Sequence, residues 1–170
     1  MRAEPTRHGV SALRDYAYAA YRLGDGADAE DATSDALERA LRYRKSYDPR
    51  RGEPAAWLIG IAQRCVDDIL RSRARLLPLG DELPEAADPT VLDDGVVFRL
   101  GVAQAMRSLD DRDRELIALR YGADLTARQI AELQEARVNT VEVALHRAVG
   151  RLRAAYDELH EPRRTAASQP

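Results

Sequence analysis

Apolar side chains recur every three or four residues along most of this chain, which is the period of a helix. The first such stripe runs from Ser11 to Leu23 and stops at Gly24-Asp25-Gly26, where glycine can take the left-handed backbone that closes a helix. No segment shows the strict alternation of a β-strand. The pattern therefore predicts an all-α fold.

A second and a third helix follow before residue 76. We expect Asp28 to cap the second helix, with Asp31 three residues later as in a capping box. A loop with Asp48-Pro49 and Gly52 comes next, and Pro54 suits the first turn of the third helix. Trp57 lies on the apolar stripe of that helix. Its neighbours favour a place in the core over stacking on a ligand.

The second half of the chain predicts another group of helices. Three pairs of capping residues suggest where they begin: Asp110 with Asp113, Thr126 with Gln129, and Asn139 with Glu142. Between the halves, an acidic segment broken by Pro78, Gly80, Pro84 and Pro89 is typical of a flexible linker. We therefore predict two small helical domains, at residues 10–75 and 98–160, joined by a linker at 76–97 and followed by a disordered tail at 161–170.

Charge is strongly segregated along the chain, although the net formal charge is only −3 and the pI about 5.7. Residues 24–38 contain six acids and no Lys or Arg, whereas residues 39–75 contain ten basic residues and four acids. Residues 76–98 again contain six acids and no base. Blocks of alternating sign indicate local roles for charge, and the basic block suits a polyanion.

Several classes of protein find no support in the sequence. The single cysteine, Cys65, excludes an internal disulfide and suits a reducing compartment. No leader or membrane-spanning stretch is visible, so we expect a cytoplasmic protein without membrane insertion. There is no glycine-rich phosphate loop, no Cys/His metal cluster and no nucleophile with a recognisable base. We expect neither enzymatic activity nor a cofactor or metal.

Two short helices separated by a tight turn, the second longer and basic, form a helix-turn-helix pattern near residues 126–153. Together with the first half, the chain resembles the extracytoplasmic-function (ECF) group of sigma-70 family transcription initiation factors. The resemblance covers nearly all of residues 10–159. It rests on Ala29-Glu30-Asp31, Tyr47-Asp48-Pro49, Arg51-Gly52, Ala56-Trp57-Leu58, Asp68, Leu70-Arg71, Leu119-Arg120-Tyr121, Leu125-Thr126, Ile130-Ala131-Glu132 and Leu145-His146-Arg147-Ala148.

The resemblance implies that the chain binds core RNA polymerase and directs promoter-specific transcription initiation. In that family the second helix of the first domain docks on polymerase. The corresponding residues here are Asp28, Glu30, Asp31, Asp35, Glu38 and Arg42. A solvated acidic face that complements the helix dipole accounts for the same acids equally well.

The resemblance also implies that the loop before the third helix recognises and opens the minus-ten promoter element. Arg50 and Arg51 suit phosphate contacts, and Gly52 lets the backbone approach a base. We favour phosphate binding over a merely solvated helix end for the arginines near residue 75. The candidate residues are Arg50, Arg51, Gly52, Arg64, Asp67, Arg71, Arg73 and Arg75.

The helix-turn-helix would bind the minus-thirty-five element and the polymerase flap. Its candidate DNA contacts are Arg137, Asn139, Thr140, His146, Arg147 and Arg151.

The sequence departs from the family in both domains. The family usually has a small residue or glycine in the turn and Lys or Arg early in the recognition helix. Here the turn is Gln134-Glu135-Ala136-Arg137, and the helix has Glu142 and Ala144. A carboxylate repels phosphate, although it can accept a hydrogen bond from a cytosine amino group. In the first domain, Arg64 stands where the family commonly has Asn, which affects the base preference.

Two other readings belong beside the sigma-factor reading. A LuxR-like response regulator would share the helix-turn-helix, but the first half lacks the alternating strands and helices of a receiver domain. A sigma-like interaction protein would bind polymerase or a regulator without reading promoters. Glu142 and Ala144 favour that reading, whereas Arg50, Arg51 and the arginines at 71–75 oppose it. The resemblance further implies control by an anti-sigma factor.

Overall fold

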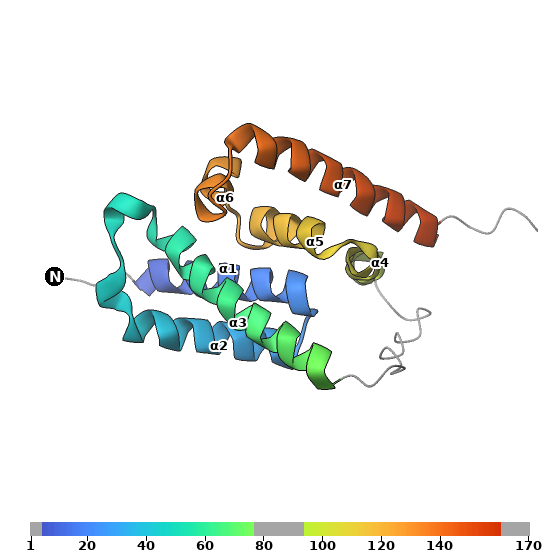
Figure 1. The fold of residues 1–170 in the computed structure, drawn as a ribbon. Coiled ribbons are helices and arrows are strands. Elements are labelled where there is room, and N and C mark those ends of the chain that lie inside the picture. Colours follow the sequence, from blue (N-terminus) through green and yellow to red (C-terminus); the bar gives the residue numbers. More distant parts are fainter. Residues whose placement is uncertain (1–4, 77–93, 161–170) are drawn as a thin grey trace, which may run out of the picture.

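The computed structural model describes residues 5–76 and 94–160, and within them it is helical with no strand. Figure 1 shows two groups of helices, α1–α3 and α4–α7, that lie against each other. Most of the predicted linker and the predicted tail fall outside the described residues. The α-helices are α1 (Pro5–Leu23), α2 (Ala27–Arg42), α3 (Pro54–Leu76), α4 (Asp94–Ser108), α5 (Asp111–Ile117), α6 (Ala127–Leu133) and α7 (Val138–His160).

Helices α1, α2 and α3 pack on one another and form the N-terminal unit. Gly24 ends α1 with a positive φ of 89°, and its N–H donates to the carbonyl of Ala20 at 2.9 Å. Pro54 starts α3, as predicted. Ile59 and Val66 are fully buried on the inner face of α3, and burying such side chains contributes roughly 2 kcal/mol each.

Two of the three predicted caps are confirmed in the C-terminal unit. The Asp110 side chain accepts a hydrogen bond from the N–H of Asp113 at 2.8 Å and begins α5. Thr126 and Gln129 form a reciprocal capping box at the start of α6. Between these two helices, a π-helical segment, η4 (Ala118–Gly122), carries the buried side chain of Leu119.

Three predicted helix starts are wrong. Helix α1 begins at Pro5, six residues before the predicted Ser11. Helix α2 begins after Gly26 and has no side-chain cap, because the Asp28 carboxylate pairs with Arg73 instead. Helix α7 begins at Val138, so Asn139 is already its second residue and no third capping box forms.

Most of the buried apolar side chains of the two units belong to one continuous cluster. Tyr18 and Ile59 of the N-terminal unit share it with Leu119, Leu125 and Ile130 of the C-terminal unit. Contacts between α1 and η4 account for most of this junction. The all-α, two-domain prediction is confirmed, but in this structure the two domains pack on each other.

Among the described residues, no helix combines the length and the apolar character that crossing a membrane requires.

Candidate nucleic-acid interface

The loop between α2 and α3 is shaped by local hydrogen bonds. Asp48 caps the short helix η2 (Pro49–Arg51) by accepting from the N–H of Arg50 at 2.9 Å. Gly52 follows with a φ of 140°, a backbone conformation that residues other than glycine rarely adopt. The Tyr47 hydroxyl donates to the Gly52 carbonyl at 3.0 Å. The loop therefore presents Arg50 and Arg51, both exposed, from an ordered frame.

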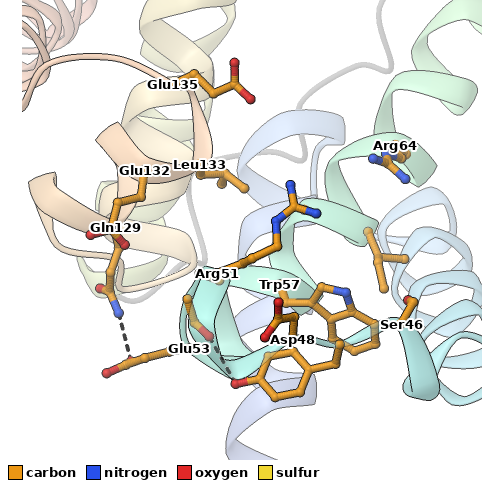
Figure 2. A pocket seen from close by; sticks show the side chains of 15 residues that line it. Ser46, Asp48, Arg51, Glu53, Trp57, Arg64, Gln129, Glu132, Leu133 and Glu135 are labelled. Atoms are coloured by element: carbon orange, nitrogen blue, oxygen red, sulfur yellow. Dashed lines mark hydrogen bonds between the residues drawn. The ribbon is translucent and has the colours of Figure 1, made fainter.

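Trp57 does not lie in the core, in contrast to our prediction. It is only partly buried, and its ring packs against that of Tyr47 with centroids 5.6 Å apart. Both rings line a cleft of about 450 Å³ together with Arg51 and Arg64. Figure 2 shows this cleft between the loop and α6. Tyr47, ten residues earlier in the chain, supplies the aromatic partner of Trp57 at the surface.

The opposite wall of this cleft belongs to the C-terminal unit. Glu132, Leu133 and Glu135 contribute to it from α6 and the turn that follows. Gln129 of α6 donates to the Glu53 carboxylate at 3.0 Å and joins the two walls at the loop. Arg64 on α3 and Arg51 on the loop therefore lie across the cleft from acidic side chains of the C-terminal unit.

Arg64 and Asp67 are exposed on the same side of α3. Both line a second hollow with Gln63, and the far side of that hollow again comes from the C-terminal unit, through Glu115 and Leu133. The structure thus brings Arg51, Arg64 and Asp67 onto one continuous face. That this face reads DNA stays a prediction.

The arginines at the end of α3 have partners inside the protein. Arg71 pairs with Asp68 at 2.9 Å, and the Arg75 Nε donates to the Arg71 carbonyl at 3.3 Å. Arg73 binds the Asp28 carboxylate and donates to the Leu23 carbonyl at 3.1 Å. Arg73 therefore ties α3 to the start of α2. Phosphate binding by these three residues stays a prediction.

The acidic face of α2 is open to solvent. Glu30, Asp31, Asp35 and Glu38 are exposed, and Arg42 pairs with Glu38 at 2.6 Å. The internal pairing of Asp28 separates it from the other acids that we assigned to polymerase.

The predicted DNA contacts of α7 divide into two faces. Asn139, Thr140, Arg147 and Arg151 line one hollow of about 450 Å³, where Arg112 of α5 joins them. Arg151 also pairs with the buried carboxylate of Asp113. The sequence pattern did not identify Arg112 as a candidate because it lies on α5, outside the helix-turn-helix.

His146 lies on the other face of α7. There it lines a separate hollow with Tyr121 and Glu142. Arg137 is exposed just before the helix. Ala144 is partly buried and packs against the apolar core. Ala144 also lines the hollow that Asn139, Thr140 and Arg147 share.

The turn between α6 and α7 forms without glycine. Glu135 takes the left-handed conformation with a φ of 52°. The Ala136 N–H donates to the Ala131 carbonyl at 2.8 Å and closes the turn. An L-residue in this conformation costs about 1–2 kcal/mol, so the helix-turn-helix carries local strain.

Comparisons with known proteins agree with this geometry. Residues 12–76 match the family model for Sigma-70 region 2, and residues 99–152 match that for Sigma-70, region 4. The chain is 34% identical over 126 residues to the ECF RNA polymerase sigma factor SigK of Mycobacterium sp. (strain KMS), covering 71% of this chain and 65% of that protein. It thus spans just under two thirds of the length of that relative.

A second relative is matched over more of its length. The ECF RNA polymerase sigma factor SigK of Mycolicibacterium vanbaalenii is 30% identical over 140 residues, or 77% of this chain and 70% of that protein. Among solved structures, the fold resembles the sigma factor RpoE of Bartonella quintana, crystallised with the anti-sigma factor NepR. The TM-score is 0.68 at 20% identity, covering 88% of this chain and 94% of that one. With both regions matched in chain order, the chain belongs to the ECF group of sigma-70 family RNA polymerase sigma factors.

Proposed function

We propose that this protein binds core RNA polymerase and directs it to promoters, acting in the cytoplasm and catalysing no reaction itself. The observation that carries this proposal is the face formed by the 46–54 loop and α3. It combines an aromatic pair, a glycine with positive φ and exposed arginines around one cleft. Such a surface suits single-stranded DNA, which is bound by stacking and by cations along the backbone.

The energetics of promoter opening fit this surface. Taking a base out of the duplex costs a few kcal/mol. Stacking one base on an aromatic side chain returns about 1–3 kcal/mol, and contacts from Arg50 and Arg51 to phosphate add to this. Tyr47 and Trp57 offer the aromatic surface, and Gly52 leaves room for the backbone beside it. The loop therefore supplies interactions of the size that opening requires.

The helix-turn-helix would contact duplex DNA upstream. Helix α7 presents Asn139, Thr140 and Arg147 on its outer face, and all three are exposed. A helix of this kind places its first turns in the major groove, where such side chains reach base edges and phosphates.

Contacts with proteins complete the proposal. The exposed acids of α2 suit a basic docking surface on core polymerase. The likeness to RpoE of Bartonella quintana, which was solved with NepR, supports control of this chain by an anti-sigma factor.

Run-off transcription tests the proposal directly. Core polymerase, this protein and sheared genomic promoter DNA should give discrete transcripts that polymerase alone does not give. A transcript pattern equal to that of polymerase alone would overturn the sigma-factor assignment. Core binding without specific transcripts would instead favour a promoter-blind interaction protein. Glu142 favours that reading, since its carboxylate is exposed on α7, whereas Ala144 is partly buried against the apolar core.

A further inference from the structure

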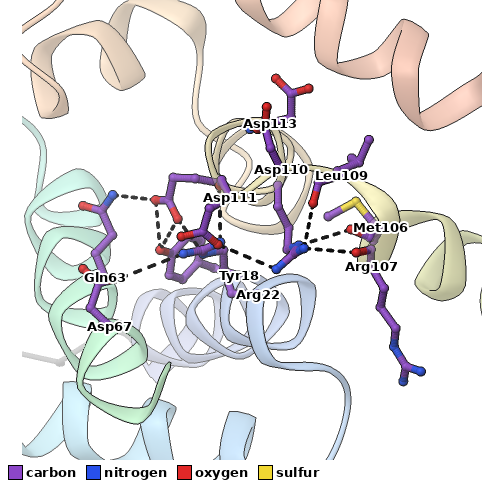
Figure 3. A network of polar contacts seen from close by, with 12 residues as sticks. Tyr18, Arg22, Gln63, Asp67, Met106, Arg107, Leu109, Asp110, Asp111 and Asp113 are labelled. Carbon is purple, nitrogen blue, oxygen red and sulfur yellow. Dashed lines mark hydrogen bonds and ion pairs between the residues drawn. The ribbon is translucent and has the colours of Figure 1, made fainter. Parts of the chain in front are cut away.

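A polar network centred on the buried side chain of Arg22 joins the N-terminal unit to the C-terminal unit. The side chain of Arg22 on α1 is only 3% exposed, and it pairs with Asp111 at 3.0 Å and with Glu115 at 2.7 Å. Tyr18 donates to the Glu115 carboxylate at 2.9 Å, and Gln63 of α3 donates to it at 2.6 Å. Figure 3 shows how α1, α3 and α5 meet at this point.

The network shifts the protonation of its acids in opposite directions. Burial raises the pKa of Glu115, whereas the hydrogen bonds from Gln63 and Tyr18 and the positive charge of Arg22 lower it. The hydrogen bond from Arg22 lowers the pKa of the more exposed Asp111. When the two units are packed together, the largely buried Glu115 carboxylate therefore needs hydrogen bonds from several donors.

An apolar contact lies beside the network and brings two backbones together. Tyr18 and Leu119 are fully buried there. A Cβ added to Gly122 would lie 2.9 Å from both the Cα and the N of Tyr18. Helix α1 and the end of η4 thus touch at a position that has no space for a side chain. At the rim, Arg14 pairs with Asp124 at 2.9 Å.

This junction places α6 over the DNA-reading face of α3. A Cβ added to Gly60 would lie 3.3 Å from the Cδ1 of Leu133, so α6 touches the middle of that face. A DNA strand running along α3 from Trp57 to Asp67 would have to cross this contact. Glu135 on the same wall would repel its phosphates, whereas the charge of Glu132 is partly offset by its ion pair with Arg128 at 3.1 Å.

The chemistry of the junction suits reversible closure. Buried ion pairs add little net stability, because the attraction between the charges is offset by the loss of their hydration. When the units separate, Arg22 and Glu115 regain water, whereas Asp111 is mostly exposed already. The polar part of the junction therefore adds less to the closure than the apolar part beside it, which includes Tyr18, Leu119 and Leu125.

We propose that the Arg22–Glu115–Asp111 network and the Gly122 contact form an intramolecular latch, which closes α6 over α3 and must open before the loop and α3 take up single-stranded DNA. The proposal rests on the DNA-binding function proposed above. It assigns inhibition to the chain itself, in addition to any regulator. Helix α7 keeps its outer face exposed in the closed form, so the latch acts on one of the two DNA-reading surfaces only.

Two variants open the latch by different routes. Gly122→Ala forces the backbones apart, and Gly150→Ala is its control, because a Cβ at Gly150 of α7 meets nothing within 4 Å. Asp111→Arg replaces the partner of Arg22 with a like charge at a side chain that is 75% exposed, so it does not disturb the core. Glu158→Arg makes the same change of charge at an exposed site on α7.

Small-angle X-ray scattering of the full chain measures closure. Both latch variants should show a radius of gyration about 2–4 Å above that of the wild type, and both controls should match the wild type. Circular dichroism checks that the variants remain helical. If Gly122→Ala unfolds, Asp111→Arg decides the test. An Asp111→Arg protein that stays helical and as compact as the wild type would overturn the latch.

Binding of a short fluorescent single-stranded DNA of mixed sequence measures access to α3. A latch that leaves about one wild-type molecule in ten open predicts about tenfold tighter binding by the opened variants. An expanded variant that binds this probe no better than its control would overturn the gating of α3.

The same proteins separate failure of the latch from failure of the proposed function. If wild type and opened variants alike give no specific transcript with core polymerase while the opened variants still expand and bind single strands more tightly, the sigma-factor function fails and the latch stands. If specific transcripts appear but the radius and single-strand affinity do not respond, the latch fails and the function stands.

Discussion

The two surfaces that we assign to DNA differ in what lies in front of them. The loop and α3 carry Arg51 and Arg64 in a cleft whose far wall holds Glu132 and Glu135. The outer face of α7 carries exposed Arg147 with no wall from the N-terminal unit among the residues that line its hollow. One surface is covered and the other is open, although both are rich in arginine. Packing between the units therefore decides which cations reach a ligand first.

The partners of the arginines sharpen this difference. Arg73 and Arg151 looked alike in sequence, since each was a basic residue on the predicted DNA side of a helix. The structure pairs Arg73 with Asp28 and Arg151 with Asp113. Within the described residues, Arg50, Arg51 and Arg147 have no such acid. We expect mutations to separate these two groups.

The largest effect should come from Asp15 on α1, the helix that backs the covered surface. Asp15 is 1% exposed, its Oδ2 has no hydrogen-bond partner, and burial raises its pKa from 3.8 to about 7. Between about pH 4 and about pH 7, the Asp15 carboxyl is ionised in the unfolded chain but keeps its proton in the folded protein. Asp15 therefore lowers the free energy of unfolding as the pH rises from about 4 to about 7, and the full loss persists above that.

Asp15→Asn should remove this loss, which is on the order of a few kcal/mol. Urea unfolding of both proteins at about pH 4 and about pH 8 measures it. The free energy of unfolding of the variant minus that of the wild type should be larger at about pH 8 than at about pH 4. If the two proteins differ in free energy of unfolding by the same amount at both pH values, the pKa of Asp15 is not raised by folding.

Arg50→Ala combined with Arg51→Ala tests the covered surface itself. We expect promoter opening to fall by about tenfold or more, with core binding unchanged, because two phosphate contacts are lost. The slope of log affinity for single strands against log salt should become shallower by about 1.4. Arg99→Ala with Arg107→Ala is the matched control, since it removes the same charge from exposed sites on α4. Permanganate footprinting of the melted region measures opening, and equal opening by both double variants would remove the loop arginines from the mechanism.

Arg147→Ala and His146→Ala compare the two faces of α7. If the face shared with Arg112 meets DNA, Arg147→Ala should weaken duplex binding about fivefold and reduce the salt slope by about 0.9. His146→Ala should then change binding little. Gel-shift titration on a promoter fragment at several salt concentrations measures both. The opposite ranking would assign DNA to the face with Tyr121 and Glu142.

The sequence predicted those features that depend on neighbours along the chain. The caps at Asp110 and Thr126 are confirmed because each needs only the residue three positions later. Asp28 failed as a cap because its partner, Arg73, lies 45 residues away. The junction between the units had no local signal, since Tyr18 and Glu115 are separated by 97 residues. Contacts of this kind depend on tertiary packing, which periodicity does not encode.

The smallest effect concerns the turn of the helix-turn-helix, where the open surface begins. Glu135 has a φ of 52°, in a turn where the family usually has a small residue or glycine. Glu135→Gly should raise the free energy of unfolding by about 0.5–1 kcal/mol, because relief of the left-handed strain exceeds the added entropy of the unfolded chain. Urea unfolding at one pH measures the change.

Ala136→Gly is the matched control for this turn. Ala136 is the next residue and is exposed, but it has no positive φ. Glycine there adds entropy to the unfolded chain without relieving strain, so Ala136→Gly should lower stability by about 0.4–1 kcal/mol. Opposite signs at adjacent positions would locate the strain at Glu135. Equal losses at both would show that the turn keeps its glutamate without strain, and that the absence of glycine costs the open surface nothing.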